Sequence, residues 1–224
     1  MPEAAARERI LERLRSARAV AAPAHEPAAP KELSGVSPLA AKSWPPPERL
    51  VRLRHCMEAV RAEFLEATAD TWPAVVRAAL RDAGARTLMA GAGGPLAAAL
   101  AVSSADGAAP KLLLYDRPIE EIKPTLFAEV DAGITTCLGG IAETGGLVLC
   151  PSGSEPRLLS LVPPIHVVLL DPARIWDTLW HAVRDLGWAA GMPPNAVVIS
   201  GPSKTADIEQ TLAYGVHEIG RAHV

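Results

Sequence analysis

The stretch TWPAVVRAALRDAGARTLMAG, residues 71–91, decides how the sequence folds. Its first part predicts a helix, because Thr71 is placed to cap it, Pro73 stands in the first turn and Gly84 follows where a C-terminal glycine belongs. The segment RTLMAG, residues 86–91, is a short apolar run that ends in glycine, which is typical of a buried strand. A helix followed directly by a buried strand is the repeating unit of an α/β fold.

The same alternation extends in both directions along the chain. Short Val- and Leu-rich strands between helices predict an α/β domain with an open, mostly parallel sheet and flanking helices. The longest expected helix begins at Asp171, which would cap it, with Pro172 at its first position. Further helices are expected over 48–60, 93–103, 118–130 and 205–215, with the Asp171 helix reaching residue 188, and further strands over 62–67, 111–116, 133–135, 146–150, 166–171 and 196–200.

The N-terminal part of the chain has a different character. Residues 3–19 favour a helix with a narrow apolar stripe, and the proline-rich segment 21–47 can form neither a continuous helix nor a central strand. We therefore expect an N-terminal helix and Pro/Ala-rich arm over residues 1–47 and the α/β domain over residues 48–224. The arm either reaches a partner subunit or is loose, and the sequence leaves both open.

Bulk properties limit the function classes. The 224 residues are 49% hydrophobic, and the net charge of −3 gives no field that would recruit nucleic acid or an anionic membrane. The most apolar stretch, residues 158–170, is too short and too interrupted to span a bilayer, and no signal peptide is recognisable. Cys56, Cys137 and Cys150 lie too far apart for a local cluster or zinc motif. We expect a cytoplasmic protein with inert thiols and no metal site.

Open α/β sheets bind ligands where strands end and loops lead into helices, which directs attention to the loops at 91–95, 139–146 and 200–205. The segment GAGGPL begins like a dinucleotide-binding motif, but Leu96 replaces its last glycine, so a tight turn is favoured. The segment GPSKT resembles the end of a P-loop, but the upstream glycine is missing and Pro202 removes an N–H group. Neither segment supports a nucleotide site.

A more general anion site remains possible at residues 200–205. Ser203, Lys204 and Thr205 stand at the expected N-terminus of the 205–215 helix, where the helix dipole favours a carboxylate or phosphate, and Ser200 is included in the same site. The alternative is that Ser203 or Thr205 simply caps the helix.

The second unusual stretch is LGGIAETGGLVLC, residues 138–150, in which two glycine pairs flank Glu143 and Thr144. Glycine lets the backbone turn sharply and present these side chains. Glu143 is the candidate catalytic residue, as a carboxylate with a raised pKa, and Thr144 is a candidate for binding the substrate anion. Glu143 could equally accept N–H bonds within a turn. His166, at the start of an apolar strand, is interpreted as a structural histidine.

Four ordered segments together resemble the lactate-utilization (LUD) domain family across nearly the whole chain. The resemblance implies a fold similar to the sugar-phosphate isomerase and coenzyme A transferase group. It also implies participation in oxidising L-lactate to pyruvate with two iron–sulfur partner proteins, so that electrons leave through a partner and no cofactor is expected in this chain. The segments are GIT (133–135), IAETGGLVL (141–149), SLVPPIHVVLL (160–170) and ISGPSKTADIEQTLAYGVH (199–217).

Two departures from the family pattern bear on the site. Gly145-Gly146 stands where the family commonly has Gly-Thr, so a hydroxyl role is lost or moves to Thr144. The family usually continues with another strand after its last histidine, whereas this sequence ends RAHV, so an edge strand is expected to be short or completed by a partner. Two functions stay open: a subunit without turnover alone, or a stand-alone transferase- or ligase-like enzyme that uses Glu143 on a small carboxylate or phosphate. The second rests on fold analogy.

Overall fold

The computed structural model describes residues 8–9, 12–13, 42–103, 110–201, 204–206, 212–214 and 221–223. The chain divides into two compact units, Met1–Ala41 and Lys42–Val224. In the first unit the described residues are helical, within the helix expected over residues 3–19. All elements named below belong to the second unit.

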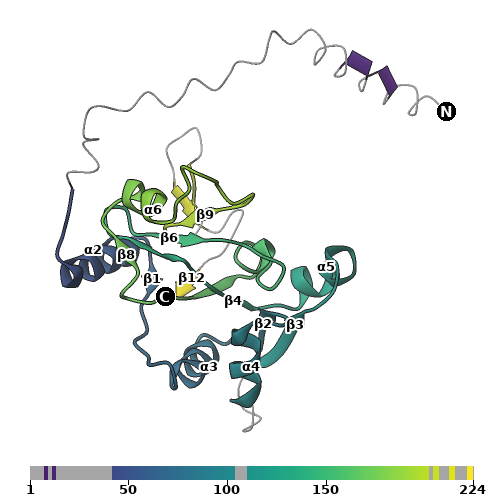
Figure 1. Ribbon diagram of the computed structural model, residues 1–224. Helices are drawn as coiled ribbons and strands as arrows, with labels where there is room; N and C mark the ends of the chain where they lie inside the picture. Colours follow the sequence, from purple (N-terminus) through teal and green to yellow (C-terminus); the bar gives the residue numbers. More distant parts are fainter. Residues whose placement is uncertain are drawn as a thin grey trace. The chain divides into compact units, whose positions relative to one another are not determined.

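Six parallel strands form the main sheet of the second unit (Figure 1). Every neighbouring pair in it is parallel, which confirms the expected α/β fold with an open parallel sheet. The strand expected over residues 62–67 is shorter than predicted. The order is β1 (Ala62–Glu63), β12 (Arg221–His223), β7 (Ile165–Leu169), β4 (Ala132–Thr136), β2 (Thr87–Gly91) and β3 (Lys111–Tyr115).

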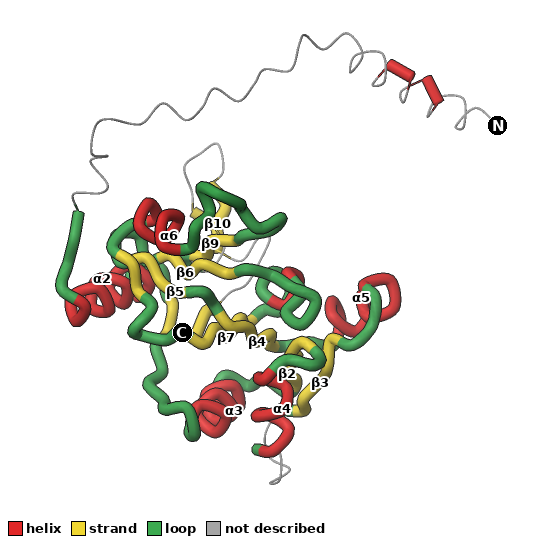
Figure 2. Tube along the Cα trace, viewed as in Figure 1, coloured by secondary structure: helices red, strands yellow, loops and turns green. Residues whose placement is uncertain are grey.

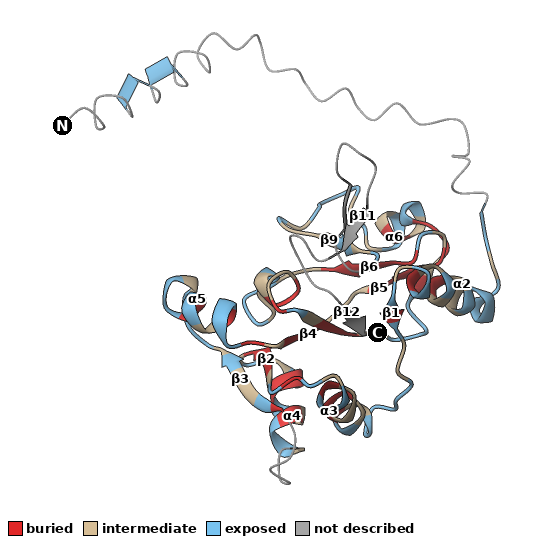
Figure 3. Ribbon diagram, turned by 180° about the vertical axis from the view of Figure 1, so that it is seen from behind, coloured by how far each residue is buried: buried red, intermediate tan, exposed pale blue. Residues whose placement is uncertain are grey.

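Helices cover the main sheet on both faces. Along β2, Leu88 and Ala90 belong to a core cluster with α3 (Trp72–Asp82) and α4 (Pro95–Val102), as the strand's alternation requires. Met89 points to the opposite face and packs with α5 (Ile119–Ala128) and the short 3₁₀ helix η1 (Arg157–Leu159). Figure 3 shows buried residues on β2, β4 and α4. Within the part of the chain that the structure describes, no helix has the length and apolarity needed to cross a membrane.

A second sheet, which the sequence did not predict, uses strands expected in the main sheet (Figure 2). Its central pair, β5 and β6, is an antiparallel hairpin, and β9 adds antiparallel to β6 while β8 adds parallel to β5. The helix α2 (Pro46–Glu58) packs its buried Leu53 and Met57 against this sheet. The four strands, in order, are β8 (Ile175–Trp176), β5 (Gly139–Ile141), β6 (Gly146–Leu149) and β9 (Val197–Ile199).

The long helix expected over residues 171–188 is wrong in its first half. Asp171 does not cap a helix: its carboxylate accepts a bond from the Ala173 N–H, 2.9 Å away, within a turn. Ile175 then pairs with Gly140 in the second sheet, and α6 begins only at Leu179 and ends at Asp185. Pairing with β5 therefore outweighs the helical pattern of the local sequence.

The helix expected over residues 205–215 is also wrong where the structure describes it. Residues 204–206 and 212–214 form the antiparallel strands β10 (Lys204–Ala206) and β11 (Leu212–Tyr214). A hairpin satisfies these backbone groups across the pair instead of along a helix. The last strand, β12, lies between β1 and β7, so the segment RAHV contributes an interior strand and not an edge strand.

Candidate functional site

Glu143 lies in the turn that joins β5 to β6, and the fold explains how it is held there. The turn spans residues 142–145, and Gly145 closes it with a φ of +70°, a conformation that favours glycine. The backbone N–H of Glu143 donates to the carbonyl of Asp177, with N and O 3.0 Å apart. Its carboxylate forms an ion pair with the ammonium group of Lys42 and is partly exposed. The turn therefore presents one carboxylate with one cation beside it.

A buried carboxylate holds the segment that carries Lys42. Asp177 accepts a bond from the Trp44 N–H at 2.7 Å and another from Nε of Arg49 at 2.9 Å. Arg49 also donates through Nη1 to the carbonyl of Ile175, 3.2 Å away. These contacts tie the chain preceding α2 to β8 and place Lys42 next to the turn. The sequence reasoning missed both Lys42 and Asp177, because 101 and 34 positions separate them from Glu143.

The structure brings two of the segments singled out in the sequence to the same end of the second sheet. Leu147 of β6 pairs with Ile199 of β9, so the antiparallel register places the following residue, Ser200, beside the Glu143 turn. Thr144 and Ser200 are both exposed there. This end of an antiparallel sheet is not the carboxyl edge of parallel strands, which is where the sequence reasoning had expected the 139–146 and 200–205 loops to lie.

The remaining anion-site residues have a different standing. Ser203 lies outside the described residues, and for Lys204 and Thr205 only the backbone is described. That backbone belongs to β10, so no helix dipole supports an anion at this point. A role for these side chains remains a prediction from the sequence.

The carboxyl edge of the main sheet contains a cleft of about 550 Å³, which the sequence reasoning did not find. It lies between the loop after β1 and the ends of β4 and β7. Among the described residues that line it, Arg174 is the only cation, and its walls are mostly apolar. In the sequence, the charged pair Asp171 and Arg174 directly after a strand could have indicated this cleft, but both residues had been assigned to the predicted helix over 171–188. The polar lining residues are Thr68, Thr136, Cys137, Asp171 and Arg174.

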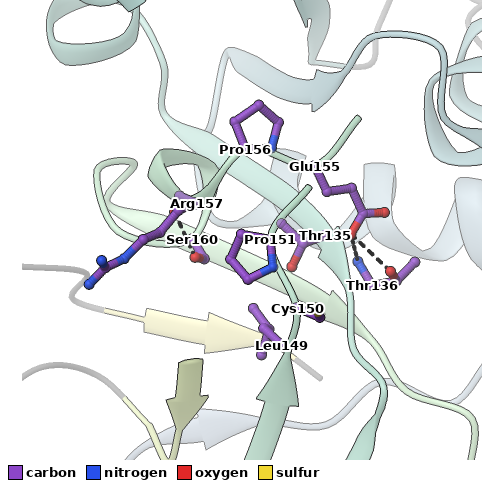
Figure 4. A pocket seen from close by; sticks show the side chains of 9 residues that line it. All are labelled: Thr135, Thr136, Leu149, Cys150, Pro151, Glu155, Pro156, Arg157 and Ser160. Atoms are coloured by element: carbon purple, nitrogen blue, oxygen red, sulfur yellow. Dashed lines mark hydrogen bonds between the residues drawn. The ribbon is translucent and has the colours of Figure 1, made fainter. Parts of the chain in front are cut away.

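Next to the cleft, the loop carboxylate of Glu155 binds the end of β4 (Figure 4). Glu155 accepts bonds from the N–H and from the hydroxyl of Thr136, at 3.0 and 2.9 Å, while Arg157 points away from it. The loop approaches β2 so closely that a Cβ atom at Gly91 would lie 1.6 Å from the Ser154 carbonyl oxygen. The space left between these residues is about 10 Å³, about the size of a single water site.

Two titratable side chains, the buried His166 and the half-buried Cys137, lie near these spaces. Burial lowers the pKa of His166 to about 3, and its Nε2 atom lies 2.9 Å from the Thr135 hydroxyl oxygen. This arrangement agrees with a structural histidine. Burial raises the pKa of the Cys137 thiol to about 12, and the thiol donates to the Leu169 carbonyl, 3.4 Å away. Neither group is charged at neutral pH. Across the described residues no three His, Cys, Asp or Glu side chains are grouped as a metal site would need.

Comparisons with known proteins agree on one family. A model of the LUD domain matches residues 52–224. An uncharacterized protein of Neisseria meningitidis is 40% identical over 223 residues, which cover 95% of this chain and 89% of that protein. Lactate utilization protein C of Halalkalibacterium halodurans is 32% identical over 93 residues, a match that spans only 40% of each chain. A crystal structure of a DUF162 family protein from Deinococcus radiodurans has the same fold, with a TM-score of 0.62, 22% identity, and coverage of 81% of this chain and 98% of that one.

Proposed function

The chain belongs to the LUD domain family, and from this premise we propose that it acts in the oxidation of L-lactate to pyruvate, as a subunit that needs partner proteins for turnover. The relative named lactate utilization protein C supports the lactate role. Because that alignment covers about two fifths of each protein, the substrate and the partners are part of the proposal.

The proposed partners carry iron–sulfur clusters that accept the electrons removed from lactate. A cluster held by this chain would need closely spaced cysteine ligands, as in a C-x-x-C motif, and its three cysteines stand far apart in the sequence. The oxidation removes two electrons and two protons from the hydroxyl-bearing carbon and its oxygen. The chain's own contribution would be to bind the anion and to accept a proton.

The observation that carries the site assignment is the meeting of the Glu143 turn with Ser200 at one end of the second sheet. Glu143 is the proposed proton acceptor, because its carboxylate is partly exposed and Lys42 holds it in place. Thr144 and Ser200 offer hydroxyl donors for the anion. Ser203, Lys204 and Thr205 follow Ser200 after Gly201 and Pro202 and complete the proposed anion site.

The proposal is tested with the purified chain, alone and together with its candidate iron–sulfur partners, by following L-lactate oxidation with an artificial electron acceptor. Activity is expected only in the reconstituted complex. Glu143→Gln and Lys204→Ala should each lower this activity by at least about tenfold. The matched controls Glu121→Gln and Lys123→Ala change exposed residues of α5 and should leave it unchanged.

The outcomes separate the parts of the proposal. Turnover by the isolated chain would favour a stand-alone enzyme, transferase- or ligase-like, over a subunit. Unchanged activity in both site variants of an active complex would remove the site assignment and leave the lactate role in place. A complex that oxidises no lactate would overturn the role itself.

A further inference from the structure

The cleft at the carboxyl edge of the main sheet is larger than lactate requires. Its volume is about 550 Å³, within the range of roughly 300–1,000 Å³ that small-molecule sites usually have. Taking about 30 Å³ for each water-sized group, a lactate ion would fill roughly a third of it or less. The cleft therefore has room for a longer molecule.

Its walls divide into an apolar part and one charged end. Leu65 and Ala69 line it from the loop after β1, the half-buried Trp72 lines it from the start of α3, and Leu170 continues the apolar surface after β7. Such walls favour an aliphatic or aromatic body. Because the Cys137 thiol is protonated, it adds no negative charge to this surface.

The charged end is Arg174. Its backbone is held on both sides, since its N–H donates to the Asp171 carbonyl and its carbonyl accepts from the Gly140 N–H, each at 2.9 Å. The guanidinium is exposed, and within the described ranges no ion pair or hydrogen bond of this side chain is recorded. Asp171, the one carboxylate among the described lining residues, accepts a bond from the Ala173 N–H. An arginine held in this way can bind a carboxylate or phosphate through two parallel bonds.

We propose that this cleft binds an organic anion larger than lactate, whose phosphate or carboxylate pairs with Arg174 and whose apolar body lies along Leu65 and Trp72. The inference does not depend on lactate oxidation, because the cleft is separate from the Glu143 turn and binding is measured without turnover. It assigns a second ligand to the domain, at the strand ends where open α/β sheets hold their ligands.

The test uses the full chain and the fluorescent anion 8-anilinonaphthalene-1-sulfonate. We expect saturable binding with one site, and a dissociation constant at least about tenfold higher in Arg174→Gln. The control Arg81→Gln changes an exposed arginine of α3 that does not line the cleft, and its affinity should equal that of the wild type. Circular dichroism verifies that both variants are folded, and hydrogen exchange should show protection of residues 65–72 and 169–174.

Competition then identifies the charged group. Phenyl phosphate and 3-phenylpropionate have similar bodies, so the one that displaces the probe at lower concentration names a phosphate or a carboxylate. If neither compound displaces the probe, the proposal is overturned. Equal affinity of wild type and Arg174→Gln for the anionic probe also overturns it. So does tighter binding of the cationic probe thioflavin T that protects the same residues, 65–72 and 169–174, because the cleft would then bind cations through Asp171.

Discussion

The Nε2 atom of His166 lies 2.9 Å from the hydroxyl oxygen of Thr135, and both side chains are buried. The two residues stand on the neighbouring parallel strands β7 and β4. Because burial lowers the pKa of His166 from 6.5 to about 3, the folded protein keeps this imidazole neutral through the pH range in which the unfolded chain protonates it. Between pH 6.5 and about 3 the unfolded state therefore binds the additional proton.

This difference predicts that the free energy of unfolding falls as the pH drops below 6.5. The contribution of His166 reaches at most about 1.4 kcal/mol for each pH unit between 6.5 and 3, and it is absent above pH 7.5. Urea unfolding at pH 7.5, 6 and 5 measures the slope. His166→Gln should flatten it, while His55→Gln, at an exposed position of α2, should keep it. An unchanged slope in His166→Gln would contradict the assignment.

Asp177 is predicted to be the main anchor of the segment before α2. Asp177→Ala leaves the Arg49 guanidinium and the Trp44 N–H without their shared acceptor, and should lower the free energy of unfolding by about 2–3 kcal/mol, less than a fully buried pair because Arg49 is partly exposed. Asp177→Asn keeps one acceptor oxygen and should cost less. Arg54→Gln removes two exposed ion pairs and a contact with the Phe64 ring, and should lower the free energy of unfolding by much less than Asp177→Ala does. Urea unfolding measures these free energies, and an equal decrease in Asp177→Ala and Arg54→Gln would contradict the role of Asp177 as the main anchor.

The main sheet could be predicted because its signals are local. In α3 and β2, the proline in the first turn, the terminal glycine and the apolar run all lie within residues 71–91, and the structure follows them, although the Thr71 side chain makes no capping bond to α3. The second sheet depends on contacts that no local pattern carries. Gly139 and Gly140 make room for Trp176 and Leu53, and this packing draws the segment after β7 into a strand. The apolar residues of that segment do have helical spacing, but the local preference for a helix stabilises it less than the pairing of β8 with β5 does.

Gly91 is predicted to set the position of the loop that carries Glu155. Gly91→Ala places a Cβ against the Ser154 carbonyl, so the loop must move, at a cost of about 1–3 kcal/mol. The bond from the Thr136 N–H to Glu155 should then weaken, and this amide should exchange its hydrogen faster. Gly153→Ala, in the same loop, meets open space and should change neither stability nor exchange. Identical exchange at Thr136 in both variants would show that the loop is not held at Gly91.

The candidate site was only partly accessible to sequence reasoning, for a related reason. The glycine pairs around Glu143 predict a turn. The register of β6 with β9, which the sequence does not indicate, brings Ser200 next to that turn. Lys42 reaches the same turn because Asp177 holds the segment before α2. It does so by accepting a bond from the Trp44 N–H, 133 positions away in the sequence. The cleft beside Arg174 was hidden by the mistaken helix, since a helix there would not have placed the Arg174 carbonyl next to the Gly140 N–H of β5.

Cys137 is predicted to be unreactive although it lines the cleft. Only the thiolate reacts with iodoacetamide, and burial raises the pKa of this thiol from 9.0 to about 12, so at pH 8 the folded protein should hold about a thousandfold less thiolate at Cys137 than the unfolded chain does. Timed alkylation at pH 8, followed by mass spectrometry of the peptide that contains Cys137, measures the rate. The same residue in 8 M urea, roughly the concentration needed for full unfolding, is its own control and should react rapidly. Comparable rates in the two states would mean that the Leu169 carbonyl and the surrounding core do not shield the thiol as the structure requires.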